Sequence, residues 1–273
     1  MRIRIDSHNS SSHGAKELSK FLGAKILKQE NSNYVPRRTD IVINWGNSDA
    51  RPWFLTGNTP RTILNNVRAV ATASDKLNSF KAFTDWNTSH PDQLISFPEY
   101  TTSLETAKTW VKETGLIISR ALLRASEGRG MAVDREPLEL VENLPTRLWV
   151  AYKRKSDEYR VHIFQSEPIS IQRKARIRGA ENVNTQIRNH HNGWIFAREG
   201  VLERPEIEQV KAQAVLACTA LGLDFGAVDV VYSAKKDKCW VIEVNTSPGL
   251  EGQTISDYGN AIQKVINELR TQS

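Results

Sequence analysis

The sequence predicts a mixed α/β protein with more than one lobe. In the first seventy residues, short apolar runs alternate with a helical segment, an order that is typical of a parallel sheet. Near the carboxyl end, two apolar runs at 226–232 and 239–245 flank a short polar turn, which predicts an antiparallel hairpin. The 273 residues, 39% of them hydrophobic and 25% charged, are enough for a sizeable core or for two or three lobes.

The individual elements follow from two periodicities. Short apolar runs between turn residues predict strands, and apolar residues that recur every three or four positions predict helices. We expect strands over 2–5, 24–27, 40–46, 61–66, 116–123, 147–153, 158–164, 226–232 and 239–245. We expect helices over 15–23, from an N-cap at Ser74 through Trp86, and over 102–115, 205–223 and 256–270.

Composition limits the class of protein. The amino terminus has no long apolar core and no stretch elsewhere approaches a membrane span, so we expect no membrane association. The two cysteines, Cys218 and Cys239, are too few for a disulfide framework and are typical of a reduced, cytoplasmic protein. The formal net charge is +6, and residues 153–188 contain nine Lys or Arg and four Asp or Glu. This basic window favours an anionic partner, which could be nucleotide phosphates, nucleic acid or an acidic substrate.

The hairpin carries a pair of carboxylates. If the chain turns around Lys236, residues whose numbers sum to 472 lie opposite each other, so Asp229 faces Glu243. Alternation along the strands then places Asp229, Glu243 and Asn245 on one face. The opposite face, which would pack in the core, receives Val228, Val230, Trp240, Ile242 and Val244. Two like charges opposite each other destabilise a sheet unless something offsets them. A divalent cation would do so, and these oxygen donors suit magnesium better than zinc. A solvated strand face is the alternative.

A second candidate site is the loop SEGRGM at 126–131, which follows a predicted strand. Its glycines would allow backbone N–H groups to approach phosphate oxygens, although a plain hairpin has the same composition. The sequence has no GxxxxGK[ST], GxGxxG or GxSxG motif and no protein-kinase motif set. These absences exclude a P-loop, a dinucleotide fingerprint, a protein kinase and a hydrolase elbow. The adjacent His190 and His191 indicate a surface loop rather than a metal site.

These motifs, in this order, resemble the ATP-grasp carboxylate–amine ligases, a family that includes D-alanine–D-alanine ligases and ribosomal-protein glutamate ligases. GLDFGAVDVVY and WVIEVNTSPGLEG, within 222–252, are similar to the family's carboxyl-terminal signature. ASDKLNSFKAF (73–83) resembles the segment that opens the central domain, and LIISRALLRASEGRGM (116–131) resembles the strand and loop over the phosphates. The basic segment 173–196 is closest to the glutamate-ligase branch. The resemblance implies a small α/β domain at 1–72, followed by two α+β lobes, 73–150 and 151–273, that clamp ATP.

The resemblance also implies roles for individual residues. ATP would be bound by Lys76, Arg120, Ser126, Arg129, Gly130, Tyr152, Lys153, Glu158 and Lys174. Magnesium, as two ions with Mn²⁺ as an alternative, would be bound by Asp229, Glu243 and Asn245. Arg160, Lys174 and Arg188 would be catalytic, and Arg188, Asn189, Ser247 and Gly249 would contact substrate. The chain departs from the family pattern in having Arg120 where a lysine is usual and Ala151 where a carboxylate precedes the hinge.

The implied reaction is the ATP-dependent activation of a carboxylate as an acylphosphate, which an amine attacks to form an amide. The acid and amine could be small molecules, peptides or proteins. The basic window is compatible with an acceptor that is an anion. Two alternatives remain at this point. The same fold could serve a kinase or a carboxylase that forms no amide, or the protein could bind nucleic acid with a vestigial ATP site.

Overall fold

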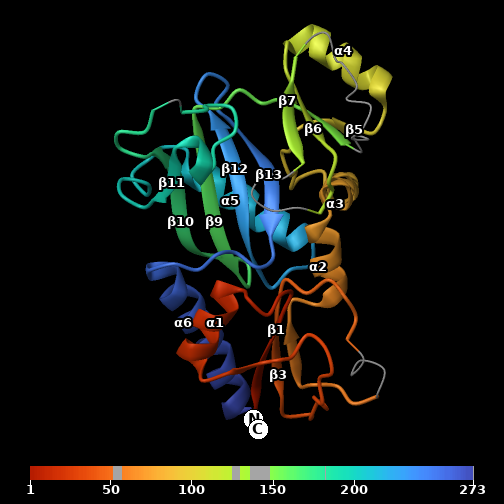
Figure 1. The fold of residues 1–273 in the computed structure, drawn as a ribbon, viewed down its shortest axis with the longest axis vertical. Helices are drawn as coiled ribbons and strands as arrows, with labels where there is room; N and C mark the ends of the chain where they lie inside the picture. The colour runs from red at the N-terminus through yellow and green to blue at the C-terminus, as the bar shows by residue number, and fades with distance from the viewer. Residues whose placement is uncertain (52–56, 125–129, 136–147, 182, 273) are drawn as a thin grey trace.

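The protein is built on sheets that occupy three parts of an elongated molecule. The computed structural model describes residues 1–51, 57–124, 130–135, 148–181 and 183–272, and the strands in these ranges form three sheets. One sheet lies at the end of the molecule that holds both termini, and the other two lie together at the opposite end (Figure 1). The predicted mixture of helices and sheets is confirmed.

The amino-terminal sheet is parallel, as the alternation of strands and helix predicts. Its order is β2 (Lys25–Ile26), β1 (Ile3–Ser7), β3 (Ile41–Trp45) and β4 (Thr62–Leu64), and each neighbouring pair is parallel. Helix α1 (His13–Leu22) begins where the Ser12 hydroxyl accepts a hydrogen bond from the N–H of Ala15, and it ends at Gly23 in the left-handed conformation.

The central sheet has the order β5 (Tyr100–Thr101), β8 (Leu148–Ala151), β6 (Ile117–Arg120) and β7 (Met131–Asp134), and its pairs are antiparallel. Helix α4 (Leu104–Thr114) packs on it through a small cluster that includes Ala107, Val111 and Trp149. Helices α2 (Val67–Ser74) and α3 (Lys76–Ser89) lead from the amino-terminal sheet to this part of the protein.

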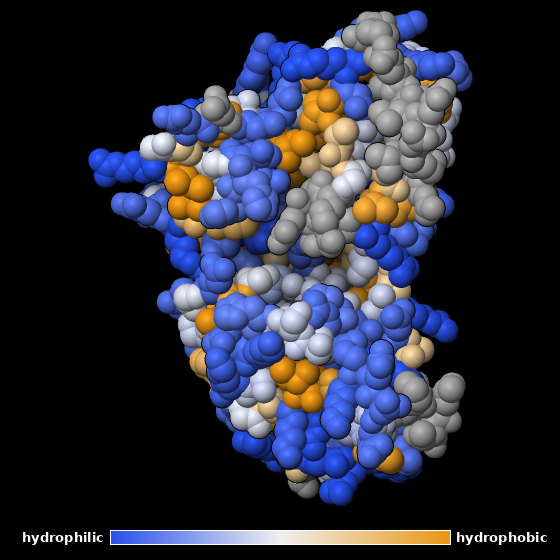
Figure 2. All heavy atoms as spheres, viewed as in Figure 1, coloured by the Kyte–Doolittle hydropathy of each residue, from blue (hydrophilic) through white to orange (hydrophobic). Residues whose placement is uncertain are grey.

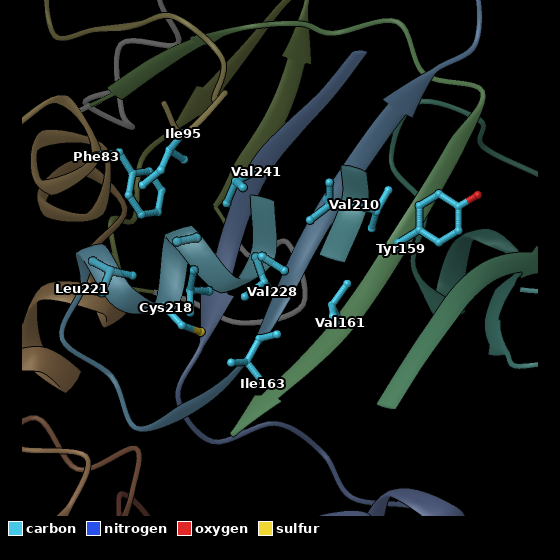
Figure 3. Packing of buried hydrophobic residues seen from close by; sticks show 14 of the residues in the cluster. Phe83, Ile95, Tyr159, Val161, Ile163, Val210, Cys218, Leu221, Val228 and Val241 are labelled. Atoms are coloured by element: carbon cyan, nitrogen blue, oxygen red, sulfur yellow. The ribbon is translucent and has the colours of Figure 1, made fainter. Parts of the chain in front are cut away.

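The carboxyl-terminal sheet is antiparallel and has the order β11 (Trp194–Ala197), β10 (Glu167–Arg176), β9 (Asp157–Phe164), β12 (Phe225–Ser233) and β13 (Lys238–Asn245). A short 3₁₀ helix, η2 (His190–Asn192), precedes β11. Helix α5 (Ile207–Ala220) covers one face of the sheet. Its residues Val210 and Cys218 meet Val161, Ile163 and Val228 in the main core (Figure 3). The other face of the sheet is therefore the one available to a ligand.

The last helix, α6 (Gln253–Thr271), lies beside α1 (Figure 1). Its buried residues Tyr258, Ile262 and Ile266 share a core cluster with Ile5 and Leu18. The chain thus leaves the carboxyl-terminal sheet at the end of β13 and returns to the amino-terminal unit. The domain boundaries after residues 72 and 150 stay predictions.

Several elements differ from the sequence-based expectation. Residues 67–74 form α2, which was not predicted, and Ser74 ends this helix instead of capping the next one. The N-cap of α3 is Asp75, whose side chain accepts from the N–H of Asn78. Strands β5, β7, β10 and β11 are also absent from the prediction. In β10 the reason is its partly exposed and basic sequence, which weakens the apolar alternation.

The predicted pairing of the hairpin is confirmed at Asp229 and Glu243, but it is wrong for the residues nearer the turn. Asp229 faces Glu243, but between Asp229 and Val230 the pairing shifts so that Val230 faces Val241. A bulge of this kind adds one residue to a strand and re-aims the side chains that follow it. As a result Cys239 and Val241 join the main core in place of Trp240 and Ile242, and Ile242 faces the ligand cavity.

Hydrophilic residues dominate the face shown in Figure 2, where the apolar residues form small separate patches. Most large apolar side chains instead belong to the internal clusters. Among the described residues, no helix is long and apolar enough to cross a membrane.

Candidate functional site

A cavity of about 870 Å³ lies where the three parts of the protein meet. Its walls come from β6 and β8 of the central sheet, from the uncovered face of the carboxyl-terminal sheet, and from the loop that follows β1. Most of the residues that the sequence singled out line it, namely Arg120, Tyr152, Lys153, Glu158, Arg160, Lys174, Arg188, Asn189, Asp229, Glu243, Asn245, Ser247 and Gly249. Segments more than 200 residues apart in sequence are therefore brought to one place.

The two opposed carboxylates are each held by a cationic side chain. Both guanidinium nitrogens of Arg160 that face Asp229 donate to its carboxylate, at 2.7 and 2.8 Å. The Lys76 ammonium donates to Glu243 at 2.6 Å. Burial acts to raise the pKa of the Asp229 carboxyl, but Arg160 outweighs burial and holds that pKa below its usual value. These cations offset the like-charge repulsion in this structure, so the repulsion alone does not require a metal.

The donor set nevertheless fits magnesium. Asp229 and Glu243 are paired across the hairpin, Asn245 follows two residues later on β13, and all three face the same cavity. The buried Nδ2 atom of Asn245 has no hydrogen-bond partner within the described part of the chain. This N–H donor would be satisfied by an acceptor on a ligand, such as a phosphate oxygen, and only the amide oxygen of Asn245 could bind a metal. Two carboxylates and one amide offer the hard oxygen donors that Mg²⁺ prefers. No group of three or more His, Cys, Asp and Glu residues suited to a metal occurs in the described ranges, so the amide is needed to complete the set.

One end of the cavity is a partly apolar slot. Ile118 and Val150 from the central sheet and Val231 and Ile242 from the hairpin line it. At its edge the Lys155 ammonium donates to Glu158 at 2.7 Å, and both side chains are largely buried. Tyr152 and Lys153 lie in the connection between β8 and β9, and Lys153 contacts the carboxylate of Glu99. The slot can accept a flat heterocycle against its apolar walls, with a carboxylate nearby for sugar hydroxyls.

Arg120 is a cation without a counter-ion at the end of β6. Its Nε atom is buried without a hydrogen-bond partner, and the guanidinium makes no ion pair with a described residue. Burial lowers the pKa of this group, and the nearby Glu243 offsets part of that effect. A buried charge without a partner is costly, so an anionic ligand is the natural complement of Arg120.

The middle of the cavity is cationic. The Lys174 ammonium donates to the carbonyl of Arg188 at 2.9 Å and lies 4.1 Å from the centre of the Phe196 ring, which Arg160 also approaches at 4.4 Å. The Arg188 guanidinium lies 4.4 Å from the Trp194 ring and donates to the carbonyl of Ser156 at 3.1 Å. Burial lowers the pKa of Lys174 and of Arg188. The structure therefore gathers several cations around a space large enough for a polyphosphate.

Four of the predicted nucleotide-binding residues either do not line the cavity or lie outside the described residues. Lys76 does not line the cavity directly but lies behind Glu243, to which it is bonded. Gly130 does not line the cavity either; it has a left-handed backbone and packs against Leu122. Ser126 and Arg129 lie outside the described residues.

The far end of the cavity contains residues that the sequence analysis missed. Ser247 and Gly249 line it as predicted, and His8, Glu251 and Thr254 join them. His8 comes directly after β1, and ligands of open α/β sheets bind beyond the carboxyl ends of the strands. That rule, applied to the polar run HNSSSHG after the first strand, is the signal that could have found His8. The side-chain oxygen of Asn189, a predicted substrate contact, already accepts a hydrogen bond from the N–H of Asn192 at 3.0 Å.

Comparison with known proteins identifies the fold. No protein-family model matches the chain. Two curated relatives are probable alpha-L-glutamate ligases. The one from Pasteurella multocida (strain Pm70) is 26% identical over 209 residues, which are 75% of this chain and 63% of that protein. The one from Parasynechococcus marenigrum (strain WH8102) is 26% identical over 260 residues, which are 92% of this chain and 50% of that protein. The chain thus spans about half to two thirds of the length of these relatives.

Solved structures of ATP-grasp ligases share the fold over nearly the whole chain. D-alanine–D-alanine ligase from Bacillus anthracis complexed with ATP superposes with a TM-score of 0.66 at 14% identity, covering 99% of this chain and 97% of that one. The ATP-grasp ligase PsnB, complexed with a precursor variant, Mg and ADP, superposes with a TM-score of 0.63 at 14% identity, covering 97% and 98%. The chain has the ATP-grasp fold and is similar in sequence and structure to carboxylate–amine ligases of that superfamily.

Proposed function

We propose that the protein is an ADP-forming ligase that uses ATP to activate a substrate carboxylate as an acylphosphate and joins it to an amine. The observation that carries this proposal is the content of one cavity. It contains an apolar slot, a partly buried cation that makes no ion pair with a described residue, and an opposed carboxylate pair with an amide. The ligase relatives described above support it. Because the chain covers only part of the curated relatives, their own substrates are not carried over.

The adenine ring of ATP would lie in the slot between Val150, Val231 and Ile242, with its polar edge at the backbone of Tyr152 and Lys153. The Glu158 carboxylate would accept hydrogen bonds from the ribose hydroxyls, in exchange for part of its contact with Lys155. Such a slot provides apolar burial and a few polar contacts that fix orientation, as nucleotide pockets do.

The phosphates would extend from the slot towards Arg120 and Lys174. Binding an anion there would supply the counter-charge that Arg120 lacks in the protein alone. Asp229, Glu243 and Asn245 would hold magnesium, which neutralises charge on the β- and γ-phosphates when it is bound. Arg160 and Lys76 would then hold these carboxylates in position beside the cavity.

The substrate carboxylate would lie beside Arg188, near the loop that carries Ser247 and Gly249. One carboxylate oxygen attacks the γ-phosphorus, the bond to the bridging oxygen breaks, and ADP leaves. The Arg188 guanidinium, which is partly desolvated and positioned by Trp194 and Ser156, would stabilise the charge on the transferred phosphoryl group. The amine then attacks the acyl carbon, an amide forms and phosphate leaves.

The substrate class we favour is an amino acid or a peptide. D-alanine–D-alanine ligase is among the structural relatives, and PsnB and the macrocyclase MdnC from Microcystis aeruginosa were solved with precursor peptides. The basic residues of β10 and of the loop after it favour an acid that carries additional negative charge.

The test is the capture of the acylphosphate. The protein is incubated with ATP, Mg²⁺ and pools of amino acids, dipeptides and other carboxylic acids in the presence of hydroxylamine. ADP release and hydroxamate are measured. We expect hydroxamate from at least one pool, and mass measurement then identifies the acid. Glu243→Gln should abolish both signals. Glu268→Gln, the same change at an exposed position on α6, should leave both intact.

Thermal unfolding of both variants separates loss of chemistry from loss of fold, and nucleotide binding gives a second measure if Glu243→Gln is unstable. Acid-dependent ADP release that yields a stable phosphorylated product and no hydroxamate would indicate a kinase instead. None of the relatives named above is named as a kinase, a carboxylase or a nucleic-acid-binding protein.

A further inference from the structure

The far end of the cavity is formed by two loops from opposite ends of the chain. The residues after β1 lie against the segment 246–251, which connects β13 to α6. A side chain at Gly46 would collide with Ser247 and would also lie 3.3 Å from the His8 ring. A side chain at Gly14 would lie 3.0 Å from the carbonyl of Pro248. This close approach fixes His8 on the cavity wall, beside the segment that ends in Glu251.

The tautomer of His8 follows from its neighbour. Its Nδ1 atom lies 3.4 Å from the carbonyl oxygen of Trp45, and its backbone N–H donates to the same oxygen at 3.1 Å. A carbonyl oxygen only accepts, so Nδ1 carries the proton in the neutral ring and Nε2 keeps its lone pair. His8 is exposed, and it lines the cavity. A neutral imidazole with a free Nε2 atom is a proton acceptor.

Glu251 is distinct among the acidic residues on the cavity wall. Asp229, Glu158 and Glu243 are each bonded to a cationic side chain. The Glu251 carboxylate makes no ion pair with any residue in the part of the chain that the structure describes. Its backbone is held in place, because its carbonyl accepts from the Thr254 hydroxyl at 2.6 Å. An unpaired carboxylate on a fixed backbone complements a cationic group.

We propose that the end of the cavity between His8 and Glu251 receives the amine substrate, with Glu251 pairing with its ammonium form and His8 accepting its proton. This inference rests on the proposed ligase function and adds to it the place and the charge of the second substrate. The cations of the phosphate region would repel an ammonium ion, so the one cavity-wall carboxylate without a cationic partner among the described residues is the favourable location for it.

The proton balance requires such a base. An alkyl amine is protonated in neutral water and has no lone pair with which to attack. One ammonium proton passes to Nε2 of His8, and the free amine attacks the acyl carbon of the acylphosphate. The C–N bond forms, the C–O bond to phosphate breaks, and the second proton leaves with the phosphate. His8 then returns its proton to solvent.

The test compares two nucleophiles on the same acyl group. With the acid identified by the hydroxamate screen, hydroxamate formation from hydroxylamine is measured beside amide formation from a pool of amino acids, amino acid amides and polyamines. Hydroxylamine is largely uncharged at neutral pH and needs no base. His8→Gln should lower amide formation about 100-fold, the size of a general-base contribution, and should change hydroxamate formation less than about twofold. Glu251→Gln should raise the KM for the amine about fivefold, as expected for an exposed ion pair, without changing the KM for ATP.

His191→Gln and Glu268→Gln serve as matched controls, since both residues are exposed and lie outside the cavity lining. Equal losses with both nucleophiles in His8→Gln would overturn the role of His8. A higher KM for the acid instead of the amine in Glu251→Gln would overturn the subsite. The subsite is also overturned if no amine of the pool forms an amide or competes with hydroxylamine in the wild-type protein. Absence of any hydroxamate from the wild type would instead contradict the ligase function itself.

Discussion

The pair between Arg160 and Asp229 gives the sharpest prediction about the site. Asp229→Asn removes the charge of one partner and leaves the Arg160 guanidinium among Phe196, Lys174 and the hairpin with no counter-ion. The pair is bidentate, at 2.7 and 2.8 Å, and the two side chains are 21% and 11% exposed. Breaking a buried pair of this kind costs about 3–5 kcal/mol. Because Arg160 keeps about a fifth of its exposure, we expect the lower end of that range, about 3 kcal/mol.

The assay is a double-mutant cycle in urea. The free energy of unfolding is measured for the wild type, Asp229→Asn, Arg160→Met and the double variant, each without ligands. The double variant should be more stable than Asp229→Asn, because methionine removes the uncompensated charge while keeping an apolar side chain against Phe196. A coupling free energy below about 0.5 kcal/mol would refute the reasoning, since independent sites already deviate by that much. In that case solvent, not Asp229, would be what stabilises Arg160.

Three further predictions follow from the same geometry. The pKa of Asp229 lies below its ordinary value of 3.8, so its pair stabilises the protein fully above that pH and is lost as the pH falls through the lowered pKa. Below about pH 4, the urea midpoint of the wild type should therefore fall more steeply than that of Asp229→Asn. Arg120→Met should weaken ATP binding in calorimetry by tenfold or more and leave the unliganded protein at least as stable; unchanged affinity would exclude Arg120 from the phosphate site. Gly46→Ala should lower the unfolding temperature, because φ is +80° and the methyl group would lie 2.7 Å from Ser247. Gly57→Ala, at a similar φ but with no atom of the described residues beyond its chain neighbours within 4 Å of the added methyl group, should cost less.

The sequence predicts the fold well where a local pattern coincides with a core face. The parallel order of the first unit and the position of α5 follow from apolar periodicity and are both confirmed. The strands with weak patterns were missed, and β10 is the clearest case, because its Lys and Arg residues face the cavity and a partly exposed surface. The helix at residues 67–74 is absent from the prediction because the predicted N-cap, Ser74, lies eight residues, about two turns, after the actual cap at Asn66.

For the site, the sequence predicts which side chains gather in the cavity but not how they are paired. The opposition of Asp229 and Glu243 follows from counting along the hairpin. That Arg160 and Lys76 hold these two carboxylates depends on contacts across 69 and 167 residues, which no local pattern contains. The polar run after the first strand could have indicated His8, but its place beside the segment 246–251 again depends on a contact across more than 200 residues.

The bulge in β13 brings together residues of the two halves of the proposed nucleotide site. In a regular strand Ile242 would face the core and Glu243 the cavity, and no apolar side chain would stand beside the metal ligand. The extra residue turns both towards the cavity, so one short segment contributes Ile242 to the apolar slot and, next to it, Glu243 to the proposed ligands for the ion. The relative position of these two side chains is then fixed by a single peptide unit. The alternation of apolar residues in the sequence does not reveal this arrangement, because the only trace of a bulge in a sequence is that the alternation shifts by one residue.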